Sequence, residues 1–381
     1  MINVQNRLIS QYIRNNDGKW FLEVEGAPFL FHSMQGGLLP GGQAATGVKA
    51  AAELCFQTYS VCIPWDCFEP SRGSYLFEEI DELIRLAGIY NMRLDLLWSG
   101  ADHEYSPDMF EAEYEALRAL IHHLRDYDTA RRVISLQLEN VYDASRFATP
   151  SLSAIVYKNR LAGEIKELEY KIAVRVNITG REDLQERREQ DIYVADIQYT
   201  KRMLRSGDAT RFRYSENGNI IDSVATHIVE ALAYGAFYSR YTLDEYRENT
   251  ALQDLNRSLN HAHEIIATAA PHDMTTFGTG SDPVLYGQSF TPAFEAPACP
   301  GSSPAVGLLV HSGEFIYIFG SGDAFFDLPS SIAEATAGTF KNGIWAPESG
   351  RFPGQCMANG QYRLSLHAGE CVRIAFQGER L

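Results

Sequence analysis

Short apolar runs alternate with longer amphipathic stretches along most of the chain, from about residue 28 to about residue 270. The runs are too short to be helices and lie at residues 28–34, 58–64, 92–98, 132–140, 171–177, 192–198, 211–215 and 235–239. The stretches between them have helical spacing, most clearly at 76–90 and 110–125. This alternation predicts eight strand–helix units with parallel strands, and eight such units close an α/β fold of the (β/α)8 TIM-barrel type.

The amino-acid composition of the chain changes after Pro271. Glycine, serine and proline are frequent at residues 278–281 and 299–304, which we interpret as loop or linker. Short runs with strand-like alternation follow at residues 306–311, 315–319, 338–340, 362–366 and 371–375. This pattern predicts a small antiparallel β domain. We therefore divide the chain into a barrel domain at 1–275 and a segment at 276–381 that holds the linker and a β-sandwich-like domain.

Composition and charge narrow the classes of partner. With 381 residues, 45% of them hydrophobic and 22% charged, the chain can bury one large core and carry a smaller second domain. Its formal net charge of -16 argues against a nucleic acid or an anionic membrane surface as partner, because both attract clustered Lys and Arg. A neutral, hydroxyl-rich molecule such as a small saccharide fits this charge better. The oligomeric state stays open, with a homo-oligomer among the options.

The sequence lacks the usual signs of a cofactor, a metal site or a targeting segment. No glycine-rich phosphate loop follows a strand, so we expect no nucleotide cofactor. The histidines have no partner at metal-ligand spacing and the six cysteines lack C-x-x-C spacing, so we expect no metal and buried thiols. No apolar run is long enough to cross a bilayer and the first residues lack a signal-peptide pattern, so we expect a cytoplasmic protein.

Carboxyl groups that follow the predicted strands are the candidates for chemistry, because a TIM barrel carries its active site at the carboxyl ends of its strands. Glu139 lies at the end of the run 132–140 and Asp143 lies just beyond it, whereas Glu216 follows the run 211–215. Cleavage of a glycosidic bond with retention of configuration uses two carboxyl groups about 5–5.5 Å apart. A barrel can supply such a pair from two different strand ends.

Two tryptophans also lie where a sugar could contact them. Trp65 follows the run 58–64, and Trp98 closes the run 92–98. The C–H groups of a pyranose stack on an aromatic face, but either indole could equally fill the core. We favour Trp98 as a pocket wall because it closes a strand.

Extended segments of the sequence resemble a known group of proteins. Residues 63–70, Ile-Pro-Trp-Asp-Cys-Phe-Glu-Pro, are followed by Gly73 and by Ile-Asp-Glu-Leu-Ile at 80–84. Residues 93–100, Arg-Leu-Asp-Leu-Leu-Trp-Ser-Gly, and the Tyr-Ser-Glu that ends at Glu216 continue the pattern. These motifs are similar to those of the clan A glycoside hydrolases, and within them of the family thirty-five β-galactosidase-like proteins, which carry an extra C-terminal β domain. The similarity covers most of the chain from about residue 20 onward.

The resemblance implies roles for individual residues. Glu216 would be the nucleophile that attacks the anomeric carbon, and Asn140 would hold the 2-hydroxyl of the sugar. Tyr199 lies close to where the clan places a tyrosine that hydrogen-bonds the nucleophile. Glu139 corresponds to a glutamate of the strand itself, so we expect it to line the mouth of the barrel without acting as the acid.

One position departs from the pattern of the family. The family has an asparagine followed by the acid/base glutamate, whereas this chain has Asn140 followed by Val141. Valine can neither give nor take a proton, and loss of general acid catalysis lowers a rate by roughly 10² to 10⁴. Asp143 lies on the predicted loop after the strand and is a candidate to substitute for the missing acid.

Two functional hypotheses follow from these residues. In the first, the protein acts in carbohydrate metabolism as a retaining glycoside hydrolase or transglycosidase of β-galactosides or β-glucosides, with an atypical or missing acid/base. In the second, it is a catalytically inactive relative that keeps the barrel and binds carbohydrate. The glutamate at the nucleophile position, Glu216, favours the enzyme, and Val141 favours the binding protein.

Overall fold

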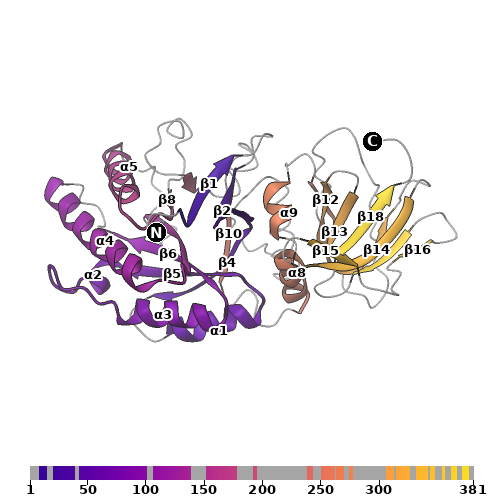
Figure 1. The fold of residues 1–381 in the computed structure, drawn as a ribbon, viewed down its shortest axis with the longest axis horizontal. Coiled ribbons are helices and arrows are strands. Elements are labelled where there is room, and N and C mark those ends of the chain that lie inside the picture. The colour runs from indigo at the N-terminus through magenta and orange to yellow at the C-terminus, as the bar shows by residue number, and fades with distance from the viewer. Residues whose placement is uncertain are drawn as a thin grey trace, which may run out of the picture.

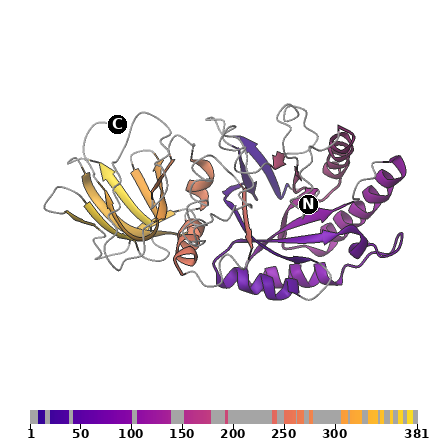
Figure 2. The same cartoon turned by 180° about the vertical axis from the view of Figure 1, so that it is seen from behind.

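The fold divides into an α/β part and a β part that are joined by two helices, as Figures 1 and 2 show from opposite sides. The computed structural model describes residues 8–14, 20–38, 43–100, 106–138, 152–177, 192–194, 238–242, 250–261, 263–269, 274–277, 306–312, 315–326, 332–341, 344–347, 354–356, 362–366 and 371–376. Among the described residues, no helix is both long and apolar enough to cross a membrane.

A parallel sheet of seven strands forms the centre of the α/β part, in the order β10-β4-β5-β6-β7-β8-β9. These strands are β4 (Phe31–Leu38), β5 (Thr58–Pro64), β6 (Arg93–Ser99), β7 (Val133–Leu138), β8 (Ala173–Asn177), β9 (Ile192–Val194) and β10 (Tyr238–Thr242). Within this sheet, the strand that comes last along the chain, β10, pairs in parallel with the one that comes first, β4. That pairing is how a sheet begins to close into a barrel. The predicted strand at 211–215 lies outside the described residues, in the chain between β9 and β10.

The observed strands differ from the predicted ones mainly at their ends. The run 58–64 coincides with β5, whereas β10 begins three residues later than the run 235–239. The run 28–34 contains the ends of two strands, because β3 ends at Phe29 and β4 begins at Phe31. The amide of His32 donates to the carbonyl of Leu30 at 3.0 Å, so the chain turns between the two strands.

Helices cover the outer face of the parallel sheet (Figure 1). They are α1 (Gln43–Glu53), α3 (Glu78–Ile89), α4 (Pro107–Tyr127) and α5 (Leu152–Lys166), together with the single turn α2 (Trp65–Phe68). Helix α4 begins where Ser106 caps it, because the Ser106 side chain accepts a hydrogen bond from the amide of Met109 at 3.2 Å. In α3 the predicted apolar stripe, Ile80, Leu83, Ile84 and Ala87, is buried against the sheet.

An antiparallel sheet of three strands closes the amino end of the barrel, and the sequence pattern did not predict it. Its strands are β1 (Ser10–Arg14), β2 (Trp20–Val24) and β3 (Ala27–Phe29). The Ser10 hydroxyl donates to the carbonyl of Ile134 and accepts from the amide of Ala173 at 2.9 Å. Both partners lie at the amino-terminal ends of barrel strands, so β1 is joined to the floor of the barrel.

The β part contains the antiparallel strands that the sequence predicted, with additions. Its main sheet has the order β11-β12-β13-β18-β14-β15, and β17 joins β13 to β16. The strands are β11 (Met274–Phe277), β12 (Val306–Ser312), β13 (Phe315–Phe326), β14 (Ile332–Lys341), β15 (Ile344–Pro347), β16 (Gly354–Cys356), β17 (Tyr362–Leu366) and β18 (Cys371–Phe376). The first of them, β11, pairs with β12. The division at 275 and 276 stays a prediction.

Two helices lie between the barrel and the β part in both views, α8 (Thr250–His261) and α9 (His263–Thr268) (Figures 1 and 2). On the barrel side, the side-chain amides of Asn256 and Asn260 donate to the carbonyls of Leu54 and Cys55, at the end of α1. On the other side, α8 packs against β13 and β14. The same helix therefore contacts both parts of the protein.

Candidate active site at the mouth of the barrel

The carboxyl ends of β5 and β6 mark the rim of the candidate site. Side chains alternate along a strand, and Ser60 and Asp95 face the barrel interior, where they contact each other. Pro64 and Ser99 have the same parity, are paired in the sheet register, and are the last residues of their strands. Both are partly exposed, whereas the residues just before them are buried. The described rim of the mouth therefore begins at Pro64 and Ser99.

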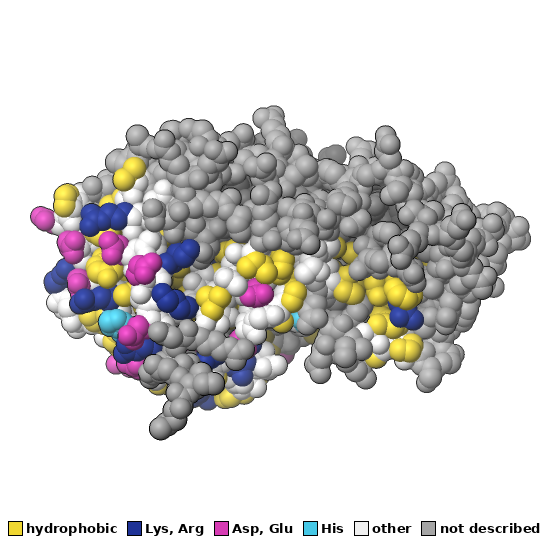
Figure 3. Space-filling view, turned by 45° about the horizontal axis from the view of Figure 1, so that its top comes forward, with side chains coloured by type: hydrophobic (Ala, Val, Ile, Leu, Met, Phe, Trp, Pro, Cys, Tyr) yellow, Lys and Arg dark blue, Asp and Glu magenta, His cyan; other side chains and the backbone are white. Residues whose placement is uncertain are grey.

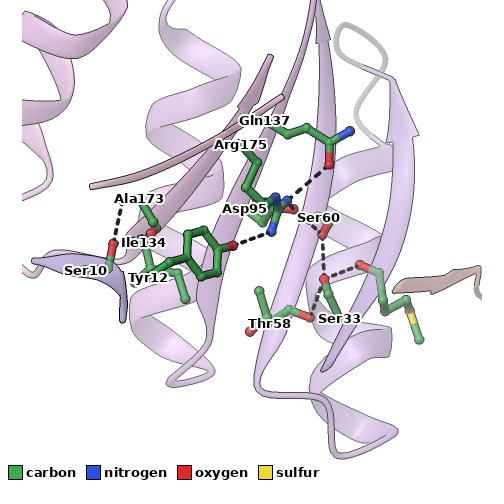
Figure 4. A network of polar contacts seen from close by, with 11 residues as sticks. Ser10, Tyr12, Ser33, Thr58, Ser60, Asp95, Ile134, Gln137, Ala173 and Arg175 are labelled. Atoms are coloured by element: carbon green, nitrogen blue, oxygen red, sulfur yellow. Dashed lines mark hydrogen bonds and ion pairs between the residues drawn. The ribbon is translucent and has the colours of Figure 1, made fainter. Parts of the chain in front are cut away.

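Beneath this rim lies a buried polar network that crosses the barrel (Figure 4). Arg175 on β8 and Asp95 on β6 are both fully buried, and the Nη2 atom of Arg175 lies 2.8 Å from each carboxylate oxygen of Asp95. The Ser60 hydroxyl donates to Asp95 at 2.8 Å, and the hydroxyls of Ser33 and Ser60 are 2.6 Å apart. Because the one hydroxyl proton of Ser60 goes to Asp95, Ser33 must be the donor to Ser60.

The network reaches both the floor and the upper part of the barrel. From the floor, the Tyr12 hydroxyl on β1 accepts a hydrogen bond from Nη1 of Arg175 at 3.1 Å. Burial raises the pKa of Tyr12 to about 12, against an opposing effect of the Arg175 charge, so this phenol is neutral. Toward the mouth, Nη2 of Arg175 also lies 3.3 Å from the side-chain oxygen of Gln137 on β7. The guanidinium stacks on the Phe31 ring, with its carbon 4.6 Å from the ring centre.

Trp65 is the predicted sugar-contacting residue that the structure places at the rim. It opens α2 immediately after β5 ends, and its side chain is partly exposed. The indole N–H donates to Oε2 of Glu69 at 2.7 Å, and Oε1 of Glu69 accepts from the amide of Gly73 at 2.6 Å. Glu69 is itself buried, so the two hydrogen bonds hold the indole in one orientation.

Trp98 lies on the face of β6 opposite to that of Asp95, so its ring points out of the barrel, between the sheet and the helices. It is fully buried, its ring packs edge-on against Phe68, and its indole N–H donates to Glu113 on α4 at 2.8 Å. The other oxygen of Glu113 accepts from the hydroxyl of Tyr157 on α5 at 2.7 Å. Of the two roles weighed for Trp98, the structure supports core packing, because a fully buried outward-facing ring has no surface open to a sugar.

The remaining predicted site residues lie outside the described residues. They are Glu139, Asn140, Val141, Asp143, Tyr199 and Glu216. What the structure gives for them is their place in the chain: Glu139 and Asn140 follow directly on Leu138, the last residue of β7. Within the described part of the chain, no group of three or more His, Cys, Asp or Glu side chains could hold a metal ion.

The interior network is the part of the site that the sequence reasoning missed. Asp95 stands alone in the apolar segment Leu94-Asp95-Leu96-Leu97, and Arg175 stands between valines. A single charge inside an apolar strand was the available signal, because a buried charge needs a partner of opposite sign. The partner could not be named, since only the strand order brings β6 and β8 to either side of β7.

The surface of the described barrel part has no single sign of charge on the face seen in Figure 3. Lys and Arg side chains are intermingled there with Asp and Glu side chains. The helices of this part also carry exposed ion pairs, such as Arg85 with Glu82 at 2.6 Å and Arg118 with Glu115 at 2.5 Å. Such exposed pairs contribute little to stability.

Comparison with solved structures identifies the fold. A glycoside hydrolase of family 5 from Bacteroides vulgatus matches with a TM-score of 0.55 at 8% identity, over 100% of this chain and 96% of its own. A family 30 subfamily 8 xylanase from Clostridium acetobutylicum matches with a TM-score of 0.52 at 10% identity, over 92% of this chain and 96% of its own. The fold is that of the clan A glycoside hydrolases. The predicted α/β TIM barrel with a small C-terminal antiparallel β domain is thereby confirmed.

A third solved structure is longer than this chain, and comparisons of the sequence itself found no match. The chain spans about half the length (54%) of an exo-beta-1,4-mannosidase from Opitutaceae bacterium strain TAV5, which matches 64% of this chain at 15% identity and a TM-score of 0.45. No protein-family model matches the sequence, and no curated protein matches it. The resemblance to the clan is confirmed at the level of the fold, while the resemblance to family thirty-five and the reading of Val141 stay predictions.

Proposed function

We propose that the protein is a retaining glycoside hydrolase or transglycosidase that acts on β-linked galactosides or glucosides at the mouth of the barrel. One observation carries the proposal: β7, the strand that leads directly into Glu139 and Asn140, lies within the parallel sheet between β6 and β8. Glu139 and Asn140 follow β7 directly, and Glu216 falls in the chain between β9 and β10, where an eight-stranded barrel still requires a strand. The clan A fold supports the same reading.

In this proposal Glu216 is the nucleophile. Its carboxylate attacks the anomeric carbon, the bond to the leaving oxygen breaks, and a covalent glycosyl-enzyme forms. Water in hydrolysis, or another hydroxyl in transfer, then attacks the same carbon, the bond to Glu216 breaks, and the proton of the attacking hydroxyl passes to Asp143 or to solvent. Asn140 holds the 2-hydroxyl, Tyr199 and Glu139 contribute to the pocket, and Trp65 stacks against the sugar from the rim.

The acid step is the unusual part of the proposed reaction. Val141 cannot protonate the leaving oxygen, so the proton comes from Asp143, from water or from a group of the substrate. Substrates whose leaving group departs as a stable anion need no such proton. The protein should therefore cleave dinitrophenyl glycosides far faster than natural disaccharides.

Val141 also favours a second candidate function, a carbohydrate-binding protein without turnover. In that case Glu216 and Asn140 would bind hydroxyl groups only. Galactose or glucose would then raise the thermal melting temperature, and no glycoside would be cleaved.

Replacement of Val141 separates the two candidates. For an enzyme that lacks only its acid/base, Val141→Glu should raise the rate on a natural disaccharide by roughly 10² to 10⁴ and leave kcat/KM for the dinitrophenyl glycoside, which reports the formation of the glycosyl-enzyme, almost unchanged. Val141→Gln is the matched control, since it has a similar shape without an acidic proton. No cleavage of any glycoside by the native protein or by Val141→Glu, together with thermal stabilisation by free sugars, would establish the binding protein instead.

A further inference from the structure

The polar network inside the barrel connects the floor of the barrel to the strand that leads into the proposed site. Five neighbouring strands, β4 to β8, each contribute one interior side chain to it. In strand order these are Ser33, Ser60, Asp95, Gln137 and Arg175 (Figure 4). All five side chains are buried. TIM-barrel interiors are ordinarily filled by branched apolar side chains, so this polar layer requires an explanation.

Stability alone does not explain the central ion pair. Removing two charges from water is costly, and a buried ion pair is often no more stable than apolar side chains of similar volume. What the Arg175 guanidinium adds is direction, because its planar group donates at fixed angles. It donates to Asp95 on β6, to Tyr12 on the floor and to Gln137 on β7.

The contact with Gln137 is the one that points toward the site. Gln137 precedes the last residue of β7, Leu138, and Glu139 and Asn140 come next in the chain. A strand held at Gln137 has a fixed height and direction at its carboxyl end, because consecutive strand residues are rigidly spaced. Asp95 and Tyr12 hold Arg175 in turn, from β6 and from the floor.

We propose that Arg175 is a positioning residue for the proposed sugar site: held by Asp95 and Tyr12, it fixes the carboxyl end of β7 through Gln137. The inference rests on the proposed function, since the residues it positions are those assigned to the sugar. A displacement of about 1 Å in such residues can lower a rate on the order of 10²-fold.

The test separates this role from a purely structural one. Asp95→Leu combined with Arg175→Met removes both charges together, so it should lower the melting temperature less than Asp95→Ala, which leaves one charge buried and unpaired. The rate of covalent adduct formation with 2,4-dinitrophenyl 2-deoxy-2-fluoro-β-galactoside or β-glucoside should fall on the order of 10²-fold. The loss should appear in the rate constant at saturating probe, because the positioning acts on the bound complex.

A second variant tests the route through Gln137. Gln137→Met leaves both charged partners in place and should lower the same rate constant by a similar factor. A triple variant that combines Asp95→Leu, Arg175→Met and Gln137→Met should be no slower than the double variant, because the double variant and Gln137→Met break the same connection between Arg175 and Gln137. Gln137→Met also tests the positioning role of Arg175 if the double variant fails to fold. Tyr170→Phe is the control: it removes a buried hydrogen bond at the amino end of the barrel, and should lower the melting temperature without changing the rate constant.

The outcomes distinguish the inference from the proposed function. An adduct in the native protein supports the function, and ratios of variant to native rates then test the inference. Native-like rates in the double variant or in Gln137→Met would overturn the inference and leave the function standing. So would independent, multiplicative losses in the triple variant. If the native protein forms no adduct, the same ratios are read from the affinity for galactose or glucose by thermal shift. If it shows neither adduct nor binding, the function and the inference fall together.

Discussion

The two ends of the barrel differ in how their polar groups are held. At the amino end, the sheet β1–β3 covers the strands, and Asp128 is almost fully buried while it accepts from the amides of Arg132 and Val133 and from the Tyr170 hydroxyl. At the carboxyl end, Pro64 and Ser99 are partly exposed and the Trp65 indole is held by one carboxylate. In TIM barrels the first arrangement serves stability and the second serves chemistry.

The interior network lies between these two ends. Tyr12 comes from the amino-end sheet and Gln137 from the strand that leads to the mouth, with Arg175 between them. A change at the amino end should therefore alter stability alone, whereas a change in the network should alter stability and the mouth together.

The largest effect is expected from breaking the ion pair on one side only. Asp95→Ala leaves the Arg175 guanidinium buried without its carboxylate, and loss of one partner of a buried pair costs about 3–5 kcal/mol. The free energy of unfolding in urea measures this cost. An Asp95→Ala protein as stable as the native one would show that water reaches Arg175 and would remove the basis for a sealed network.

The amino-terminal half of the barrel should also make folding sensitive to acid. His32 is buried on β4, and burial lowers its pKa from 6.5 to about 3, against a smaller opposing effect of the hydrogen bond with Asn256. Between about pH 6.5 and pH 3, the unfolded chain therefore binds a proton at His32 that the folded chain does not bind. Stability from this group is complete above about pH 6.5 and falls as the pH drops toward 3, by about 3 kcal/mol at pH 4.

The His32 effect is isolated by substitution. His32→Phe removes the titrating group and should flatten the dependence of the unfolding free energy on pH between pH 6.5 and pH 4 by that amount. An equal pH dependence in the native protein and in His32→Phe would contradict the assignment.

A somewhat smaller loss is expected at the floor of the barrel. Asp128→Asn turns one acceptor oxygen into a donor facing backbone amides, which should cost about 2–3 kcal/mol of unfolding free energy. The adduct rate at the mouth should not change, since Asp128 contacts the amino ends of the strands. A parallel fall in rate would show that the two ends are not separable.

The smallest effect on stability is expected at the rim. Glu69→Gln keeps the size of the side chain but cannot accept from both the Trp65 indole and the Gly73 amide, so about 1 kcal/mol should be lost. Affinity for the sugar should fall several-fold, because the indole is no longer held in one orientation. Isothermal titration with galactose and glucose measures it, and unchanged affinity would remove Trp65 from the proposed binding surface.

The regular parts of the fold could be predicted from the sequence because local periodicity determined them. The run at β5 and the buried stripe of α3 are examples, since each follows one period over its whole length. The break at Leu30 and the late start of β10 could not be predicted, because pairing partners far away in the chain decide where those strands begin.

The candidate site was predictable only in part. Trp65 was placed at the rim by its position after a strand. Trp98 satisfied the same rule, but the parity of β6 turns its ring toward α4, and parity was fixed by the interior position of Asp95. The pairing of Asp95 with Arg175 depends on strand order, which a single sequence does not contain.

Intact-protein mass spectrometry after incubation with 2,4-dinitrophenyl 2-deoxy-2-fluoro-β-galactoside or β-glucoside tests the central claim most directly, because the leaving group departs without an acid. The proposed function predicts the mass of one fluorosugar per chain, mapped to Glu216 by peptide analysis and absent from Glu216→Gln. A native protein that gains no mass while galactose or glucose raises its melting temperature would contradict the enzyme and leave a sugar-binding barrel.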